Sequence, residues 1–469
     1  MSGTIKISLT DLLNAIYRQL KSQITSEPEI AQQPYSYIIW TDGTTVYAKN
    51  GSTGQIEYSD TSSNAYKVIQ YAIDKTVESG KWGTVFVKAG LYKLTDTIYL
   101  WSGVGLVGEK HGWCDIRTTQ YTGTILLGNM NKPILKVAVH PNYVGADPMK
   151  FSVYKCFPYL ANIAIFGSYN SNYGANNGIE ITSEAGIYDF VMTGVLVGYV
   201  GGSGLYVDNP YVKIWITQSY SEFNQQHGVY ANNVGLIAIN EAYISYNSDN
   251  GVEIDSWGSI YITNSTIQRN QQGIVARGGY INIDSSSILT NNSNGIYITR
   301  LSNPVYVAIT GSSIANNGDG TGTYSNIRID SDRAVVAGNI IMDNRSPTKT
   351  TYHIYITGGW LLVEGNMFIG TPTGGIVNKT GGTLLIKNNI GYTTENGGTA
   401  TFNGDGTTTQ FKIAHGLAST PSRVIVTPAS ADASGSFYVT ADSTYIYVNY
   451  FTAPPAGTNN VVIYWYAEV

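Results

Sequence analysis

The sequence predicts an all-β protein whose largest part is a solenoid of stacked parallel strands. Three observations predict it: a repeat in the middle of the chain, an abundance of Gly and Tyr (52 and 37 of 469 residues), and a charged fraction of only 13%. Helical bundles and coiled coils need more charged helix formers, and a hydrophobic fraction of 43% excludes intrinsic disorder. The net charge of −5 argues against a nucleic-acid partner.

The repeat consists of short segments such as NNGIEI, DNGVEI and SNGIYI, spaced 22 to 31 residues apart. Their shared third position is occupied by Gly178, Gly204, Gly228, Gly251, Gly273, Gly295, Asn326, His353 and Gly375. Each unit also has an alternating apolar run upstream and a third short segment downstream, which makes three strands per turn. Leucine-rich repeats and propeller blades differ in composition or length. We therefore expect a right-handed parallel β-helix, whose neighbouring turns satisfy each other's backbone groups.

An asparagine follows the central Ile of the third segment by three residues in five units: Asn247, Asn270, Asn291, Asn317 and Asn344. Side-chain amides stacked at one corner of a solenoid can satisfy buried backbone groups. We expect these asparagines to form such a ladder.

Two parts precede the solenoid. Residues 1–30 are predicted to form an amphipathic helix, because Leu9, Leu13, Ile16, Leu20 and Ile24 recur at helical spacing. That stripe either forms a coiled-coil seam for anchoring and oligomerisation or packs onto the chain's own body.

Residues 31–80 are predicted to hold a short hairpin turning at Asp42-Gly43 and a capping helix that begins at Ser62 or Ser63. The solenoid is expected at 81–395. Residues 396–469 alternate in short strands between turns, which predicts a small antiparallel β-sandwich.

Several classes of site are not indicated. Cys114 and Cys156 either pair or are both buried, and no CxxC or HExxH motif predicts a metal. No apolar run is long enough to span a membrane, and the N-terminus lacks the pattern of a secretion signal. We expect no cofactor.

The stretch "VIQYAIDK", followed by "GTVFVKAGLYKLTDTIYLWSGVGLVGE", resembles the capping helix and first turns of the pectate-lyase superfamily of right-handed β-helices. The C-terminal region from "GDGTTTQFKIAHGL" through "SFYVTADSTYIYVNYFTAPPAGTNN" resembles small β modules appended to phage and archaeal surface or spike proteins. The resemblance implies a tailspike or surface protein with glycan ligands. It does not supply catalytic residues, because only Gln226-His227-Gly228 is similar to a motif of the polygalacturonases, and His227 is expected to be a turn residue.

One candidate binding surface is a ladder of outward side chains on successive turns: Glu180, Tyr206, Tyr230, Glu253, Val275, Tyr297, Arg328, Tyr355 and Val377. Tyr206, Tyr230, Tyr297 and Tyr355, with Arg328, would line a sugar-binding groove, since a ring covers a pyranose face while polar groups bond its edge. Alternatively, tyrosine simply suits exposed strands.

Two pairs of carboxylates are candidate catalytic groups. Glu253 with Asp255, and Asp330 with Asp332, are next-but-one neighbours and thus about 6.6 Å apart on one strand face, a spacing compatible with inverting hydrolysis. The alternative is that all four are solvated surface charges. The second pair lies near Arg328 and the longest repeat step, whose loop could form the wall of a site.

Together these observations predict a virion surface spike or fibre that binds host cell-surface polysaccharide or glycoprotein glycan, with degradation left open. We expect a homotrimer that attaches to other virion proteins through its N-terminus. The alternatives are a secreted polysaccharide lyase or glycoside hydrolase, which would be extracellular, and a cell-surface adhesin.

Overall fold

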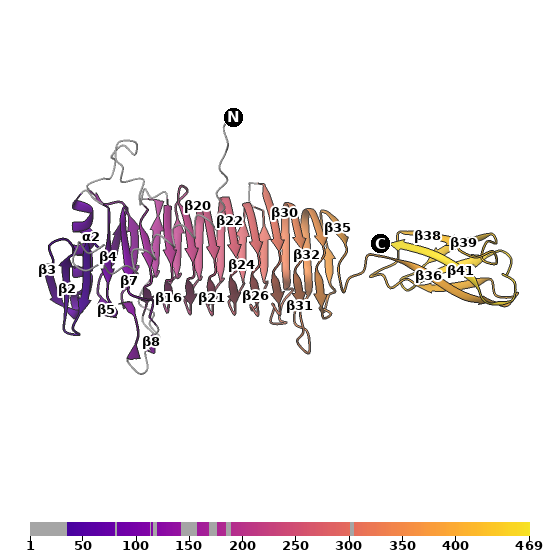
Figure 1. Cartoon of the computed structure of the whole chain (residues 1–469), viewed down its shortest axis with the longest axis horizontal. Helices are drawn as coiled ribbons and strands as arrows, with labels where there is room; N and C mark the ends of the chain where they lie inside the picture. The colour runs from indigo at the N-terminus through magenta and orange to yellow at the C-terminus, as the bar shows by residue number, and fades with distance from the viewer. Residues whose placement is uncertain are drawn as a thin grey trace, which may run out of the picture.

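The computed structural model describes residues 35–79, 82–112, 114–115, 120–141, 157–167, 176–183, 189–300 and 304–469. They form a long solenoid followed by a separate β-sandwich (Figure 1). The predicted fold class is confirmed. The amphipathic helix predicted at residues 1–30 lies outside the described residues, as does Cys156 of the cysteine pair.

A hairpin and one helix cover the N-terminal end of the solenoid. Strands β1 (Tyr37–Thr41), β2 (Thr45–Asn50) and β3 (Ile56–Thr61) are antiparallel neighbours, and the first turn lies at Asp42-Gly43 as predicted. Helix α2 (Ala65–Glu78) buries its apolar face in the solenoid core. The predicted cap is wrong: Ser62 and Ser63 belong to a preceding 3₁₀ turn, and the N-cap is Asn64, which makes no side-chain capping bond.

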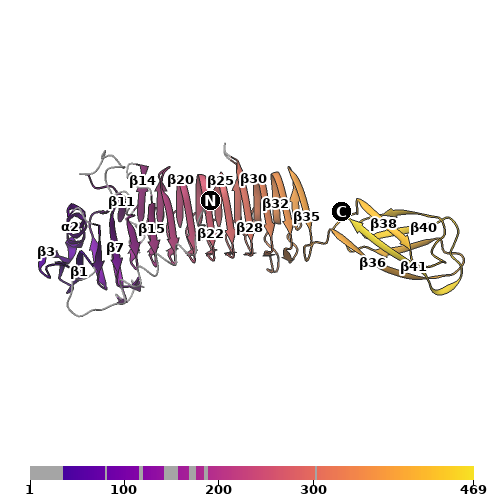
Figure 2. The ribbon, with the colours of Figure 1, turned by 45° about the horizontal axis from the view of Figure 1, so that its top comes forward.

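The solenoid has three faces, each a stack of parallel strands that follow chain order along the rod (Figure 2). Face 1 contains β6 (Ile98–Trp101), β11 (Leu135–Ala138), β14 (Ile179–Thr182), β17 (Leu205–Asp208), the first halves of β20 (Val229–Asn240) and β22 (Val252–Thr263), β24 (Ile274–Arg277), β27 (Ile296–Thr299), the first halves of β30 (Ser325–Ala337) and β32 (Tyr352–Glu364), and β34 (Val377–Lys379).

Face 2 contains β4 (Gly83–Val87), β7 (Val104–Gly108), β12 (Tyr159–Ala161), β15 (Asp189–Thr193), β18 (Lys213–Thr217), the second halves of β20 and β22, β25 (Gly279–Asp284), β28 (Val305–Thr310), the second halves of β30 and β32, and β35 (Thr383–Lys387). Face 3 contains β5 (Gly90–Leu94), β10 (Thr124–Gly128), β13 (Ala164–Phe166), β16 (Leu196–Gly198), β19 (Tyr220–Glu222), β21 (Tyr243–Ser245), β23 (Thr266–Gln268), β26 (Ser287–Leu289), β29 (Ser313–Ala315), β31 (Ile340–Met342) and β33 (Met367–Ile369).

An amide ladder runs inside the corner that follows face 3. After the first member, which accepts from the Val200 N–H, each asparagine accepts the backbone N–H of the preceding ladder asparagine at 3.0–3.3 Å. The side-chain amides donate to backbone or side-chain oxygens of neighbouring turns. Its members are Asn224, Asn247, Asn270, Asn291, Asn317 and Asn326. Four of the five predicted members are therefore confirmed. Asn344 is wrong, because it is exposed and the oxygen of Asn326 accepts from Asn317 instead, and Asn224 is a further member that was not predicted.

The repeat glycines are explained by this ladder. A Cβ at Gly251 would lie 2.6 Å from the amide nitrogen of Asn270, and one at Gly295 would lie 2.5 Å from that of Asn317. Where the repeat has Asn326 and His353 in place of glycine, these side chains continue the ladder themselves, with 3.0 Å between the Asn326 amide and His353 Nδ1.

The C-terminal module is a sandwich of two three-stranded antiparallel sheets. One contains β36 (Glu395–Gly404), β41 (Gly457–Glu468) and β38 (Arg423–Pro428); the other contains β37 (Gln410–Ala414), β40 (Tyr445–Tyr450) and β39 (Phe437–Ala441). Its buried residues form a core separate from that of the solenoid. Across the described ranges, no helix has the length and hydropathy needed to cross a bilayer.

Candidate functional site

The four predicted tyrosines lie on face 1 and are half-buried. They occupy the equivalent position of their respective turns, in one column along the rod. Tyr206 and Tyr230 stack on each other with 5.3 Å between ring centroids, and His227 stacks on Tyr230 at 5.1 Å. Because a pyranose packs on the flat side of a ring, these stacking neighbours reduce the ring surface that a sugar could use.

Arg328 lies between the other two predicted tyrosines. Its guanidinium is 5.0 Å from the ring of Tyr297 and 5.2 Å from the ring of Tyr355, a double cation–π contact. The column of outward side chains on face 1 differs from the prediction at two positions. Val275 is fully buried, and Asn378 takes the place of Val377 beside Tyr355.

The first carboxylate pair shares one arginine. Nη1 of Arg277, one turn further along, lies 2.6 Å from Glu253 and 2.8 Å from Asp255. Burial alone would raise the pKa of Glu253, but the hydrogen bonds from Arg277 and Asn250 outweigh it, and the pKa is lowered. Glu253 is therefore ionised at neutral pH, which suits a base or nucleophile better than an acid.

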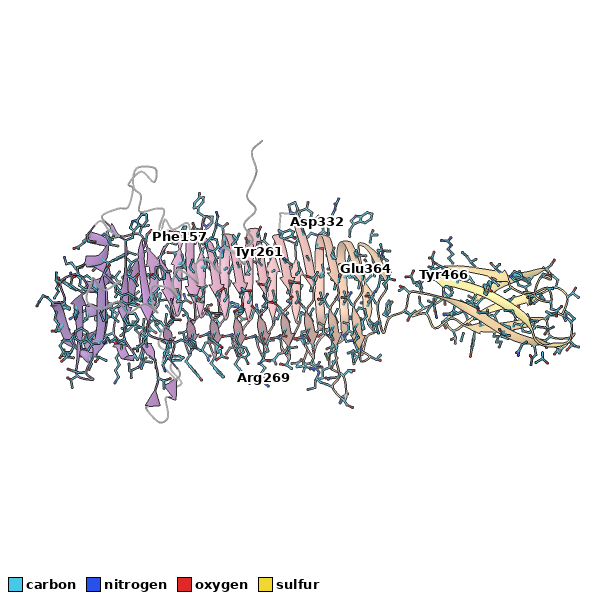
Figure 3. The ribbon with its side chains drawn as sticks, viewed as in Figure 1. Phe157, Tyr261, Arg269, Asp332, Glu364 and Tyr466 are labelled. Carbon is cyan, nitrogen blue, oxygen red and sulfur yellow. The ribbon has the colours of Figure 1, made fainter. Side chains whose placement is uncertain are left out.

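The second pair also shares one arginine, and it lies at the edge of the solenoid where Figure 3 labels Asp332. Arg300 donates to Asp330 at 2.9 Å and lies 3.3 Å from Asp332, which also accepts the backbone N–H of Val305. The two pairs are three turns apart on face 1, about 14 Å at the spacing of parallel strands, so the structure does not bring them together. Their catalytic role stays a prediction.

A concave site lies elsewhere, on face 3. An excursion of the chain between β7 and β10, containing β8 (Cys114–Asp115) and β9 (Gln120–Tyr121), projects from the solenoid beside β16 (Figure 1). Its base is closed at Gly112, where a Cβ would lie 1.7 Å from the carbonyl oxygen of Thr122. Between the excursion and face 3 is a pocket of 580 Å³, which we call the face-3 pocket. It is lined by Lys110, His111, Gly112, Thr122, Leu196, Tyr220, Glu222, Phe223, Tyr243 and Tyr246.

The floor of the face-3 pocket combines aromatic rings with one carboxyl. Tyr220 and Tyr243 occupy the same outward column on successive turns, with rings 6.1 Å apart and tilted by 47°. His111 of the excursion lies 5.7 Å from the Tyr220 ring. Glu222 accepts a hydrogen bond of 2.8 Å from the Ser245 hydroxyl. Burial raises the pKa of Glu222, and this hydrogen bond offsets only part of that effect.

One wall of the pocket is an aromatic stack at the corner after face 3. Phe223 stacks between Tyr199 and Tyr246, at 5.1 and 4.8 Å, and the Arg269 guanidinium lies 5.0 Å from the Tyr246 ring. All four residues have φ between 55° and 57°, the left-handed region that is unfavourable for side chains larger than Asn. Stacking between turns offsets part of that cost.

The sequence analysis missed these residues. A signal was present, because "YSEF" and "YISY" place aromatic residues at the first and fourth positions of the third strand segment in consecutive units. The opposing wall could not be predicted, since the excursion that forms it has no periodic pattern. In the parts of the chain that the structure covers, no group of three or more His, Cys, Asp or Glu could hold a metal.

Comparison with known proteins agrees with this fold. Residues 164–308 and 203–391 match the family described as Right handed beta helix region. A comparison with proteins of curated function gave no match. Similar solved structures include the tailspike of Escherichia coli bacteriophage HK620 in complex with a pentasaccharide (12% identity, 86% of this chain and 89% of that one, TM-score 0.49).

Two others are the tailspike of Acinetobacter baumannii bacteriophage Fri1, a capsular polysaccharide depolymerase (12%, 86% and 82%, TM-score 0.39), and the A-module of a mannuronan C-5 epimerase of Azotobacter vinelandii (15%, 69% and 94%, TM-score 0.39). At these identities the ligand has to be argued from the chain's own residues. The stacked parallel strands and the family match together identify the chain as a right-handed parallel β-helix protein.

Proposed function

We propose that this protein is a surface spike or fibre that binds glycan in the face-3 pocket. The observation that carries the proposal is the lining of that pocket, where Tyr220 and Tyr243 lie beside the Glu222 carboxyl. Rings of this kind cover the apolar faces of sugar residues, while a carboxyl and hydroxyls bond their edges. A volume of 580 Å³ is within the range of small-ligand pockets and suits a short oligosaccharide segment.

The rod shape supports a fibre that holds this pocket away from its point of attachment (Figure 1). Within this proposal the protein is located on the virion surface, forms a homotrimer, and joins other virion proteins through its N-terminus. The face 1 residues Tyr206, Tyr230, Tyr297, Tyr355 and Arg328 are a second surface that the same glycan could contact.

The test is affinity electrophoresis of the full chain in gels that contain soluble polysaccharides, such as mannan, xylan, β-glucan and lipopolysaccharide. For a polysaccharide that retards the wild type, we expect Tyr243→Ala to weaken binding at least about tenfold, the loss of one stacking contact and its hydroxyl. The matched control is Tyr464→Ala, because Tyr464 is 57% exposed on the C-terminal module and far from the pocket.

Retardation that survives Tyr243→Ala and Tyr220→Ala, but is lost in Tyr230→Ala and Tyr355→Ala, would move the binding site to face 1. No retardation by any polysaccharide would contradict glycan binding for that panel.

An enzymatic function is the second candidate, and the raised pKa of Glu222 in the pocket favours it, since a general acid needs a protonated carboxyl near neutral pH. It predicts release of new reducing ends or unsaturated products from a bound polysaccharide, with loss of that release in Glu222→Gln. Loss in Glu253→Gln or Asp330→Asn would instead assign the chemistry to a face 1 pair.

A further inference from the structure

One sheet of the C-terminal module has an outer face that combines aromatic rings with amide groups. Strands β37, β40 and β39 alternate between residues of the module core and residues that point outward (Figure 2 labels β40). In register across the three strands, the outward residues form three rows: Gln410, Asn449 and Tyr438, then Lys412, Tyr447 and Thr440, then Ala414 and Tyr445. We call this surface, together with Phe451 just after β40, the module face.

The module face has exposed rings at both ends. Tyr438 is 54% exposed and Phe451 is 72% exposed, and their ring centroids are 5.7 Å apart. Tyr445 lies two rows away, about 13 Å along the strands, and is also exposed. Because the module already has an apolar core of its own, rings grouped on its surface indicate a binding site.

The polar side chains beside these rings are held in place. Gln410 Nε2 donates to Asn449 Oδ1 at 2.9 Å, and Asn449 Nδ2 lies 3.5 Å from the Thr440 hydroxyl. A side-chain amide offers two N–H donors and one carbonyl acceptor, so the pair keeps further groups for the hydroxyls of a ligand. The face therefore presents oriented hydrogen-bonding groups next to Tyr438.

One cation lies in the middle row of the module face. Nζ of Lys412 is 5.5 Å from the centre of the Tyr447 ring and 5.9 Å from that of Tyr445. Among the residues that the structure describes, Lys412 has no partner in an ion pair. The acid beside this row, Asp442, accepts hydrogen bonds of 2.6–2.7 Å from the Tyr447 hydroxyl and two backbone N–H groups. Its carboxylate is thus occupied, and the Lys412 ammonium is available to an anionic ligand.

The outer face of the other sheet has the opposite charge. There Arg423 is paired with Glu468 at 3.1 Å, and the Tyr466 hydroxyl lies 3.2 Å from Glu395 and 3.1 Å from Glu468. This row has two carboxylates and one guanidinium, so it would repel an anion. Charge complementarity therefore assigns an anionic ligand to the module face alone of the two.

We infer that the module face is a second saccharide-binding surface, and that its ligand is a polysaccharide with acidic sugar residues. Tyr438 and Phe451 cover the apolar face of a sugar, the Gln410–Asn449 amides bond its hydroxyls, and Lys412 pairs with its carboxylate. A protein partner fits less well, because lysine is depleted at the centre of protein interfaces. This surface belongs to a different folding unit from the face-3 pocket, so the inference does not depend on that pocket.

The experiment is affinity electrophoresis of the full chain in gels that contain alginate or hyaluronan. All variants are made in a Tyr243→Ala chain, so that loss of the face-3 pocket does not obscure the result. We expect Tyr438→Ala to weaken retardation about fivefold or more and Lys412→Gln about threefold. The matched control is Tyr464→Ala, because Tyr464 is 57% exposed on the opposite sheet and should not affect binding.

The charge of the ligand gives a second readout. The propylene glycol ester of alginate, which lacks most of the free carboxylates, should bind more weakly than alginate, and Lys412→Gln should not weaken it further. Equal retardation by alginate and its ester would overturn the inference. So would retardation that ignores both Tyr438→Ala and Lys412→Gln, or its absence with both acidic polysaccharides. Retardation of the wild type that Tyr243→Ala alone abolishes would leave only the face-3 pocket as a glycan site.

Discussion

His353 shows how one repeat position changes its role along the chain. In most turns this position is glycine, because the amide ladder leaves no room for a Cβ. At His353 the imidazole is fully buried and is the last member of the ladder, with Nδ1 facing the Asn326 amide and Nε2 3.1 Å from the Ile369 carbonyl. Burial lowers the pKa of His353 to about 4, despite these carbonyl contacts.

This shift predicts a pH dependence of stability. The pKa of His353 in the folded state lies below its value in the unfolded chain. The contribution of the neutral, buried imidazole to the free energy of unfolding is therefore complete above about pH 6.5 and is lost as the pH falls toward 4. The difference corresponds to about 3 kcal/mol at most. In thermal denaturation between pH 6.5 and 4, the melting temperature of the wild type should therefore fall more steeply than that of His353→Asn. Parallel declines in the two proteins would contradict the assignment.

At the scale of the element, the amide ladder connects the turns of the solenoid. The Asn270 side chain accepts the backbone N–H of Asn247 at 3.0 Å and donates to the Ile244 carbonyl at 3.2 Å. Both groups are buried and have no access to water if that side chain is removed.

We therefore expect Asn270→Ala to lower the free energy of unfolding by about 2–4 kcal/mol, the effect of leaving two buried groups unpaired. Asn344→Ala is the matched control, because Asn344 follows an inward Ile in the same way but is exposed. It should change stability by less than about 0.5 kcal/mol. Chemical denaturation of the two variants checks this, and equal effects would show that the ladder position is not what matters.

Asn270 and Asn344 also show how far the sequence predicts this structure. Turn-by-turn register is local, so the spacing of Gly, Ile and Asn predicted the solenoid, its three strands per turn and four of the six ladder asparagines. The prediction for Asn344 was wrong although its turn keeps the register of the turn before it. Asn326, at a repeat position that is glycine in most turns, places its amide where it bonds Asn317, and the spacing of Ile and Asn does not reveal that contact. For the candidate site, outward positions were predictable, but their contacts were not. The pairing of Arg277 with Glu253 and the wall facing Tyr220 depend on side chains and chain segments that meet only in three dimensions.

At the scale of the whole molecule, the solenoid and the C-terminal module are two folding units in one rod. Each has its own core. Two backbone bonds that join them are those from the Ala418 and Val469 N–H groups to the carbonyls of Thr393 and Thr394. Little apolar surface is available for coupling at such a junction.

We expect two transitions in differential scanning calorimetry of the full chain. A chain that ends at residue 395 should keep the solenoid transition at its original temperature within about 2 °C. A single transition that shifts on truncation would show that the module stabilises the solenoid directly.

The orientation of the hydrogen bonds between turns has a mechanical consequence. Because those bonds point along the rod, a pulling force between its two ends would act on the layers of hydrogen bonds between successive turns in series. Each layer would therefore carry the full tension. The weakest layer would then set the breaking force, and a longer solenoid would be no stronger than a short one. Side-by-side packing with another rod would share that tension between chains.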